Sequence, residues 1–176
     1  MARVNRLLPA LAVLAGVLLA GCSAPAATTP PATAGVSWPG TGYVLTLPAG
    51  SVDVTGPMKQ QLSGDPAVND IEVVGSPPEG LPVVMTLSMP GAAAMGVDAY
   101  RAAQEETGLV DVHEVDPVTL DGRQASGVLG SEPDGLASLS YLVPLGDDLV
   151  VVMFLGPDPE AMQPLVDFVV ASFRWS

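Results

Sequence analysis

The stretch PVTLDGRQASGVLG, Pro117–Gly130, carries the clearest fold signal in this sequence. At its middle, Asp121 and Gly122 tolerate the positive φ angles that a two-residue type I′ turn requires. Strand-forming residues flank this turn on both sides, so the stretch predicts an antiparallel β-hairpin.

Segments of the same kind, separated by turn residues, follow one another from Gly42 onward. Ser-Pro-Pro-Glu-Gly and Pro-Asp-Gly make two of the turns. After Pro48-Ala49-Gly50, we expect the chain to return beside the first strand through Val52–Val54. The other expected strands are Tyr43–Leu47, Ile71–Val74, Leu81–Met89 and Leu136–Leu145.

One further strand is expected at the centre of the sheet. Leu149–Leu155, LVVVMFL, has seven consecutive apolar residues, which is typical of a strand buried on both faces. The acids Asp147 and Asp148 before it, and GPDP after it, guard such a strand against aggregation.

A first helix is predicted over Val97–Thr107. It places Val97, Tyr100 and Ala103 on one side, and Gly108 follows as a typical C-terminal stop. Asp98 lies in its first turn.

A second helix begins at Pro159 or Pro164 and ends near Phe173, with Asp158 as a candidate N-cap. The two helices and the hairpins predict an α+β fold, in which two main helices flank an antiparallel sheet of hairpins and a meander. The stripe expected to pack on the sheet is Met162, Leu165, Phe168, Val169 and Ser172.

The beginning of the chain reads as a secretory signal peptide over residues 1–21. Arg3 and Arg6 precede an uncharged apolar run, Leu7–Ala20. As a helix this run would span roughly 21 Å, less than a hydrocarbon core of about 30 Å. A basic start, a short apolar middle and small residues at the cut are typical of such signals. The alternative is a short buried helix.

The only cysteine follows in LAGC, Leu19–Cys22, which resembles the lipobox of bacterial lipoproteins. The resemblance implies cleavage between Gly21 and Cys22, a diacylglycerol group on the Cys22 thiol and an acyl group such as palmitate on the new amino terminus. Two or three acyl chains make a stable anchor, whereas one binds reversibly. The alternative is a free cysteine in an uncleaved helix.

Residues 22–42 are predicted to form a tether. They contain four prolines after Cys22, no charge and few large apolar residues, so they cannot form a hydrophobic core. Thr28, Thr29 and Thr33 either accept O-linked sugars or belong to an unmodified spacer. Residues 43–176 are predicted to form a single globular domain.

The charge of the chain limits its partners. Nineteen acids stand against six basic residues, for a net charge of −13. Loss of Arg3 and Arg6 with the signal peptide would leave −15 on the side chains. Such a surface repels nucleic acid and anionic headgroups. With Cys22 acylated, no thiol remains for a disulfide or zinc cluster.

The order of these segments resembles the PsbP-like lipoproteins of actinobacteria. The resemblance covers Tyr43–Trp175 and depends on five features in chain order. They are the strand YVLTLPAG, a helix before a glycine, the hairpin VTLDGRQASG, a meander of strands and a final helix that ends in ASFRW. Ser51 stands where an aromatic residue often follows the first strand. The family has no shared catalytic residues, so the resemblance implies a noncatalytic role in binding, scaffolding or assisting other envelope components.

No motif for catalysis or a cofactor is visible in the sequence. His113, the only histidine, stands among acids and reads as a surface residue rather than a catalytic base. No Gly-x-Ser-x-Gly motif and no EF-hand spacing occurs. Two alternatives stay open. The first concerns acids that are either calcium ligands or solvated turn residues: Asp147-Asp148, Asp158 with Glu160, and Asp111 to Asp121. Met85, Met89, Met153 and Met162 line either an adaptable apolar pocket or an ordinary core.

Three function classes remain. The first is a noncatalytic module of the cell envelope, lipid-anchored on the extracytoplasmic face of the cell membrane and acting through an envelope protein. The second is a carrier of a lipid or other apolar ligand, and the third, a distant alternative, is a hydrolase. Neither a metal nor a cofactor is expected, and nucleic acid is not an expected partner.

Overall fold

The computed structural model describes residues 35–61 and 69–176. This part of the chain contains a larger sheet of seven strands, in which every neighbouring pair is antiparallel. In spatial order the strands are β3 (Val52–Asp53), β4 (Ile71–Ser76), β5 (Val83–Met89), β9 (Asp148–Gly156), β8 (Ala137–Leu145), β7 (Arg123–Ser131) and β6 (Val110–Leu120).

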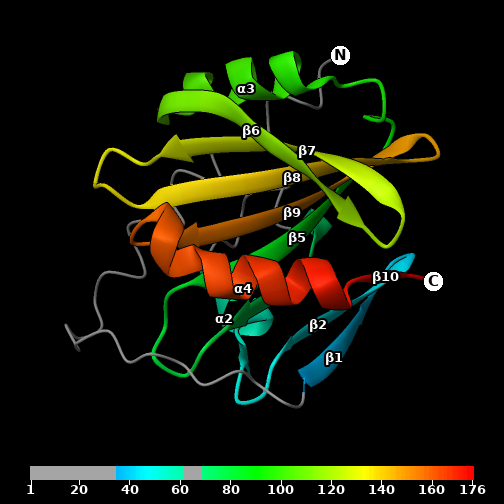
Figure 1. Ribbon diagram of the computed structural model, residues 1–176, viewed down its shortest axis with the longest axis vertical. Coiled ribbons are helices and arrows are strands. Elements are labelled where there is room, and N and C mark those ends of the chain that lie inside the picture. The colour runs from blue at the N-terminus through cyan, green and yellow to red at the C-terminus, as the bar shows by residue number, and fades with distance from the viewer. Residues whose placement is uncertain (1–34, 62–68) are drawn as a thin grey trace.

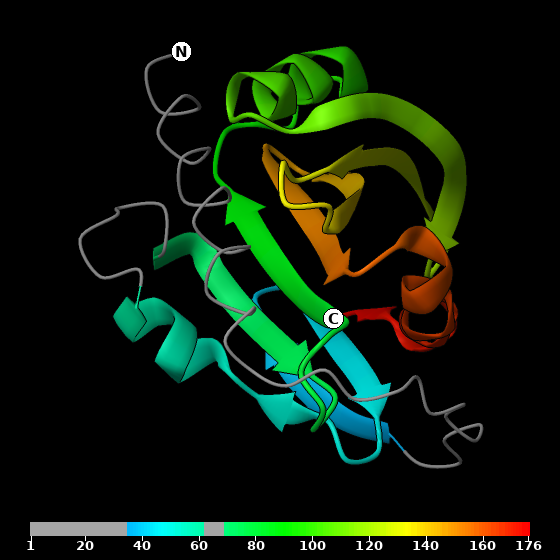
Figure 2. The ribbon, with the colours of Figure 1, turned by 90° about the vertical axis from the view of Figure 1, so that its left-hand side faces the viewer.

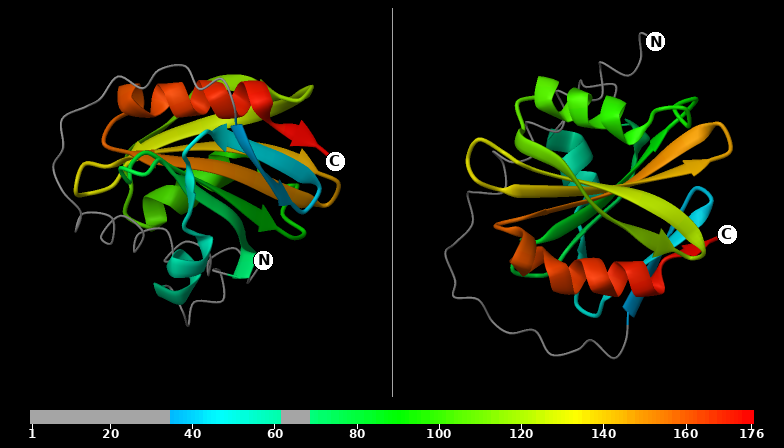
Figure 3. Two further views of the ribbon diagram at one scale, coloured as in Figure 1. Left: turned by 90° about the horizontal axis from the view of Figure 1, so that it is seen from below. Right: turned by 45° about the horizontal axis from the view of Figure 1, so that its top comes forward.

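A smaller antiparallel sheet and three described helices complete the fold. The smaller sheet has the order β1 (Gly35–Gly40), β2 (Tyr43–Pro48) and β10 (Arg174–Trp175). The helices are α2 (Thr55–Gln61), α3 (Val97–Glu106) and α4 (Pro159–Ser172). α4 and the smaller sheet lie on one face of the larger sheet, and α2 and α3 lie on the other (Figures 1 and 3). The expected α+β class, with two main helices, is therefore confirmed.

The hairpin predicted around Asp121-Gly122 joins β6 and β7. Leu120 pairs with Arg123, and the two turn residues have φ angles of 47° and 83°. The turn geometry is thus the one that the sequence predicted, because Asp and Gly accept this left-handed backbone more readily than most residues.

The predicted central strand is β9, the fourth of seven. Leu149, Val151, Met153 and Leu155 point into the core beneath α2 and α3, while the residues between them point toward α4. All seven residues of Leu149–Leu155 are at most 2% exposed. β9 is therefore buried on both faces, which explains its uninterrupted apolar sequence.

Strand β6 is strongly curved. It leaves the end of α3 and arcs toward α4 (Figure 2). Its pairing with β7 shifts register twice, between Val110 and His113 and between Val115 and Val118. Such bulges bend a strand and increase its twist. β6 therefore contributes to the core beneath α2 and α3 and also to the core beneath α4.

The described fold begins before the expected boundary at Tyr43. β1 lies inside residues 22–42, which the sequence predicted to be tether, and pairs with β2 along its whole length. GVSWPG looks like a linker because it is uncharged and contains Gly and Pro. It becomes a strand because β2 offers it a partner, and because Trp38 fills the space over Gly75. The described fold therefore starts at Gly35.

The expected return of Val52–Val54 beside the first strand is also wrong. β3 pairs with Ser76 and Gly75 of β4 instead. The physical reason is that β2 is already flanked by β1 and β10, whereas β4 has a free edge. The short helix α2, which follows, was not predicted; it buries Met58.

The two predicted helices are confirmed. α3 begins at Val97 and ends one residue before the expected Thr107. α4 begins at Pro159 and contains Pro164 within it, and the Asp158 carboxylate accepts the Ala161 backbone N–H at 2.8 Å. Met162, Leu165 and Val169 are buried as expected, whereas Phe168 and Ser172 are only half-buried. No helix in the described ranges has both the length and the apolar character needed to cross a membrane.

Candidate functional site

Buried polar side chains gather on one side of the larger sheet, beneath α3. Tyr100 and Gln104 are the buried residues of this helix. The sheet below it contributes Val112, Val128 and Leu142 to the same core, together with buried polar residues. These buried polar residues form a set that we call the polar layer: Tyr100, Gln104, Glu132, Ser138 and Ser140, each at most 4% exposed.

Strand alternation brings the members of the polar layer together. The Tyr100 hydroxyl donates to Ser140 Oγ at 3.1 Å, so Ser140 points toward α3. Ser138, two residues earlier in β8, points to the same side. On β7, Val128 belongs to the core beneath α3, and a Cβ on Gly130 would meet Leu109 and Val112 there. The same alternation places Glu132 on this side.

Burial shifts the titration of two groups in the polar layer. It raises the pKa of Tyr100 to about 12, so this phenol stays protonated and remains a donor. Burial also raises the pKa of Glu132 from 4.5 to about 6, and the negative charge of Asp134 adds to the rise. Glu132 can therefore exchange a proton near pH 6.

Two nitrogen donors of α3 are buried without a partner among the described residues. They are Arg101 Nε and Gln104 Nε2. Arg101 and Gln104 lie three residues apart, so they are neighbours on the helix surface. Buried polar groups are hydrogen-bonded in most proteins, which makes two such donors on one helix unusual.

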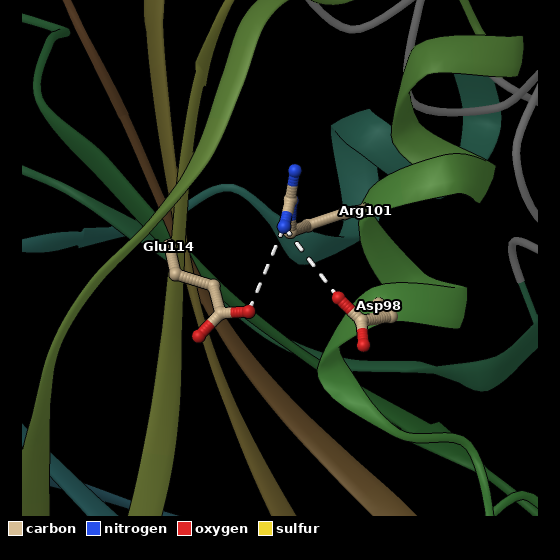
Figure 4. A network of polar contacts seen from close by, with 3 residues as sticks. All are labelled: Asp98, Arg101 and Glu114. Atoms are coloured by element: carbon tan, nitrogen blue, oxygen red, sulfur yellow. Dashed lines mark ion pairs between the residues drawn. The ribbon is translucent and has the colours of Figure 1, made fainter.

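The outer side of this region is acidic. Arg101 Nη1 lies 3.5 Å from Asp98 and 3.6 Å from Glu114, and so bridges α3 and β6 (Figure 4). Along their lengths, α3 and β6 together carry six exposed acids, which we call the acidic surface. They are Asp98, Glu105, Glu106, Asp111, Glu114 and Asp116.

The histidine singled out in the sequence is not part of the polar layer. His113 is exposed and precedes Glu114 on β6, so the two side chains point to opposite sides of the strand. Its Nδ1 lies 2.6 Å from the Asp111 backbone carbonyl oxygen.

The acids considered as calcium ligands lie at separate places in the fold. Asp148 accepts the Gly91 N–H, Asp158 caps α4 and Asp121 accepts the Trp175 N–H. Each of these carboxylates therefore has a structural partner. Within the ranges that the structure describes, His, Cys, Asp and Glu form no group of three that could hold a metal ion.

The four methionines do not line one pocket. Met85, Met89 and Met153 belong to the core beneath α2 and α3, and Met162 belongs to the core beneath α4. All four are at most 6% exposed. The predicted residues Gly21, Cys22, Thr28, Thr29 and Thr33 lie outside the described residues.

Sequence reasoning missed the polar layer. Glu132 stands beside a Pro-Asp-Gly turn and reads as one more solvated acid. The burial of Gln104 could have been predicted from the helix spacing, because Gln104 follows Tyr100 by four residues and so lies on the same helix face. The burial of Glu132 had no comparable local signal.

Comparison with known proteins supports the fold class. No family model and no curated protein sequence matches the chain. Among solved structures, the Ran-binding protein Mog1p of Saccharomyces cerevisiae is similar at 14% identity and a TM-score of 0.51, covering 81% of this chain and 94% of Mog1p. At this identity the similarity shows the fold alone, so the chain has a Mog1p-like α+β fold.

Two other solved structures are similar to the chain. A protein of Bacteroides thetaiotaomicron gives a TM-score of 0.49 at 14% identity, covering 81% of this chain and 48% of that one. The chain thus spans about half of its length. The solution structure of cyanobacterial PsbP (CyanoP) from Synechocystis gives 0.48 at 15% identity, covering 88% and 98%.

Proposed function

We propose that the chain is a lipoprotein of the cell envelope, anchored on the extracytoplasmic face of the membrane through acyl groups on Cys22. Its folded domain acts as a noncatalytic binding or scaffolding module. The observation that carries the anchor is LAGC, Leu19–Cys22, directly after a short apolar run with a basic start.

The arrangement of the fold supports this role. β1, where the described fold begins, and α3 lie at opposite ends of the long axis (Figure 1). An anchor on Cys22 would lead into the β1 end, so the end with the polar layer would face away from the membrane. The twelve residues 23–34 reach roughly 37 Å when extended. Because charges are screened over about 8 Å in physiological salt, this tether would hold the acidic domain clear of an acidic bilayer.

The anchor is tested by a Cys22→Ser variant, with Ser23→Ala as the matched control. We expect Cys22→Ser to lose incorporation of an alkyne-labelled palmitate, to keep its signal peptide and to run at the precursor mass. Ser23→Ala should be labelled and membrane-bound like the parent protein. Normal processing and acylation of Cys22→Ser would rule the anchor out.

A carrier of an apolar ligand is the second candidate. Met85 and Met153 pair across β5 and β9, and Met89 lies on the same face, so three adaptable side chains line one core. Native mass spectrometry of the protein purified from its own membrane separates the two functions. A bound lipid mass in addition to the anchor supports the carrier, and a protein partner without such a mass supports the binding module.

A further inference from the structure

Few apolar contacts hold α3 to the sheet. Its fully buried residues are Tyr100 and Gln104, and Val97 and Ala103, which are partly buried, pack beside them. On the other face, α4 buries four: Met162, Leu165, Val166 and Val169. Because most helical stability in proteins comes from packing an apolar face, α3 is held more weakly than α4.

The polar groups of α3 also oppose docking. While α3 lies on the sheet, Arg101 Nε and Gln104 Nε2 are buried without a partner among the described residues. A buried donor that has lost its water without gaining an acceptor destabilises the state that buries it. The ion pairs of Arg101 are long and partly exposed, so they compensate little.

The N-terminal end of α3 lacks the side-chain cap that stabilises α4. Gly96, the N-cap residue, provides no side-chain hydrogen bond, whereas Asp158 caps α4. The last turn of α3 carries Glu105 and Glu106 and no basic residue, and the helix dipole disfavours anions there. Gly108, with a φ angle of 102°, joins the helix to β6. A glycine, whose backbone can adopt more conformations than that of other residues, therefore flanks α3 on each side.

We propose that α3 is a movable cover, which swings off β7 and β8 about Gly96 and Gly108 while both sheets stay intact. The cover opens because water satisfies the two unpartnered donors and little apolar packing is lost. Opening exposes Ser140 and the apolar floor of Val128 and Leu142, which the docked helix hides. The inference goes beyond the proposed function, since it holds for this fold with or without the lipid anchor.

Hydrogen–deuterium exchange of the full-length protein in detergent micelles, read by mass spectrometry, tests the cover. We expect the hydrogen-bonded amides of residues 100–107 to exchange at least about tenfold faster than those of residues 162–172 in α4. Equal protection of the two helices would overturn the proposal.

Two variants test the cause of the opening. Gln104→Leu keeps the side-chain size and removes the unpartnered Nε2, so it should slow exchange in α3. Glu106→Lys, at an exposed position, should slow it through the helix dipole. The control Gln163→Leu is the same Gln-to-Leu change on the exposed side of α4, and it should leave amide exchange in α3 unchanged. If neither Gln104→Leu nor Glu106→Lys slows exchange in α3, the proposal is wrong.

Discussion

Glu132 and Glu114 lie on the same side of neighbouring strands, yet water reaches only one of them. The Glu114 side chain is 51% exposed and lies beside Arg101, whereas Glu132 is 4% exposed with no ion pair among the described residues. The same residue type is therefore a surface charge on β6 and a buried, proton-exchanging group after β7. Burial makes the difference, because it penalises the charged form of a carboxyl.

The stability of the fold should depend on pH through Glu132. Its pKa is about 6 in the fold against an ordinary 4.5. Below pH 4.5 the carboxyl is protonated in both the folded and the unfolded state, so its ionisation does not change the free energy of unfolding. As the pH rises from about 4.5 to about 6, the folded state loses up to about 2 kcal/mol of stability relative to the unfolded state, and above that pH the loss stays constant. Glu132→Gln cannot ionise, so it should raise the melting temperature at pH 7.5 and leave it unchanged at pH 4.

Circular dichroism melts between pH 4 and 8 measure this effect. Glu79→Gln, which removes an exposed turn carboxylate, is the control and should follow the parent protein at every pH. A Glu132→Gln variant whose melting curve also tracks the parent throughout would contradict the assignment.

His113 is the residue at which to test for hydrolase activity. It is exposed, and its Nδ1 contacts only a backbone carbonyl in the described structure. We expect His113→Ala to leave the melting temperature unchanged. Esterase, phosphatase and glycosidase assays should stay at background for parent and variant alike. Turnover by the parent that disappears in His113→Ala would show that the domain is an enzyme.

Among the strands, position in the sheet decides whether a strand can carry charged residues and proline. β9 lies between β5 and β8 and has no solvent-facing side, whereas β6 is an edge strand with exposed acids and Pro117. Charges and proline on an edge strand hinder pairing with another chain. β9 needs no such protection, because both of its edges are paired.

Val151→Asp should therefore unfold the domain or nearly so. Val151 is 0% exposed and pairs with Leu87 and Leu142 in the centre of the sheet. An unpartnered buried carboxylate costs several kcal/mol, against a typical domain stability of about 5–15 kcal/mol. Val110→Asp makes the same change at 49% exposure on β6 and should cost less than about 1 kcal/mol. Urea unfolding of both variants compares them, and similar midpoints would contradict the central place of β9.

At the scale of the whole molecule, charge is distributed unevenly. The acidic surface lies on α3 and β6, while Lys59, Arg123 and Arg174 lie on α2, β7 and β10. Only two ion pairs occur among the described residues, both of them at Arg101. Repulsion between carboxylates therefore outweighs attraction, and it destabilises the compact state.

Salt should stabilise this protein. Raising NaCl from about 10 to about 150 mM shortens the screening length from about 30 to about 8 Å, which weakens the repulsion carried by the net charge of −13. We expect the melting temperature at pH 7.5 to rise by several degrees. At pH 4 the rise should be smaller, because many carboxylates are then protonated. A fall in melting temperature with salt would show that ion pairs dominate instead.

The sequence by itself determined the local elements of this fold. The turn at Asp121-Gly122, the apolar run of β9 and the Asp158 cap of α4 depend on a few neighbouring residues, so they were predictable. The α+β class followed from them. The LAGC anchor signal is also local, although it lies outside the described residues.

Only the tertiary structure decided which segments meet. β1 became a strand because β2 pairs with it, and β3 joined β4 because both edges of β2 were taken. Glu132 acquired its raised pKa from burial in the fold, and the Gln104 Nε2 donor became buried without a partner among the described residues. Such burial depends on residues distant in the chain, and no local pattern encodes how deep a polar group will lie.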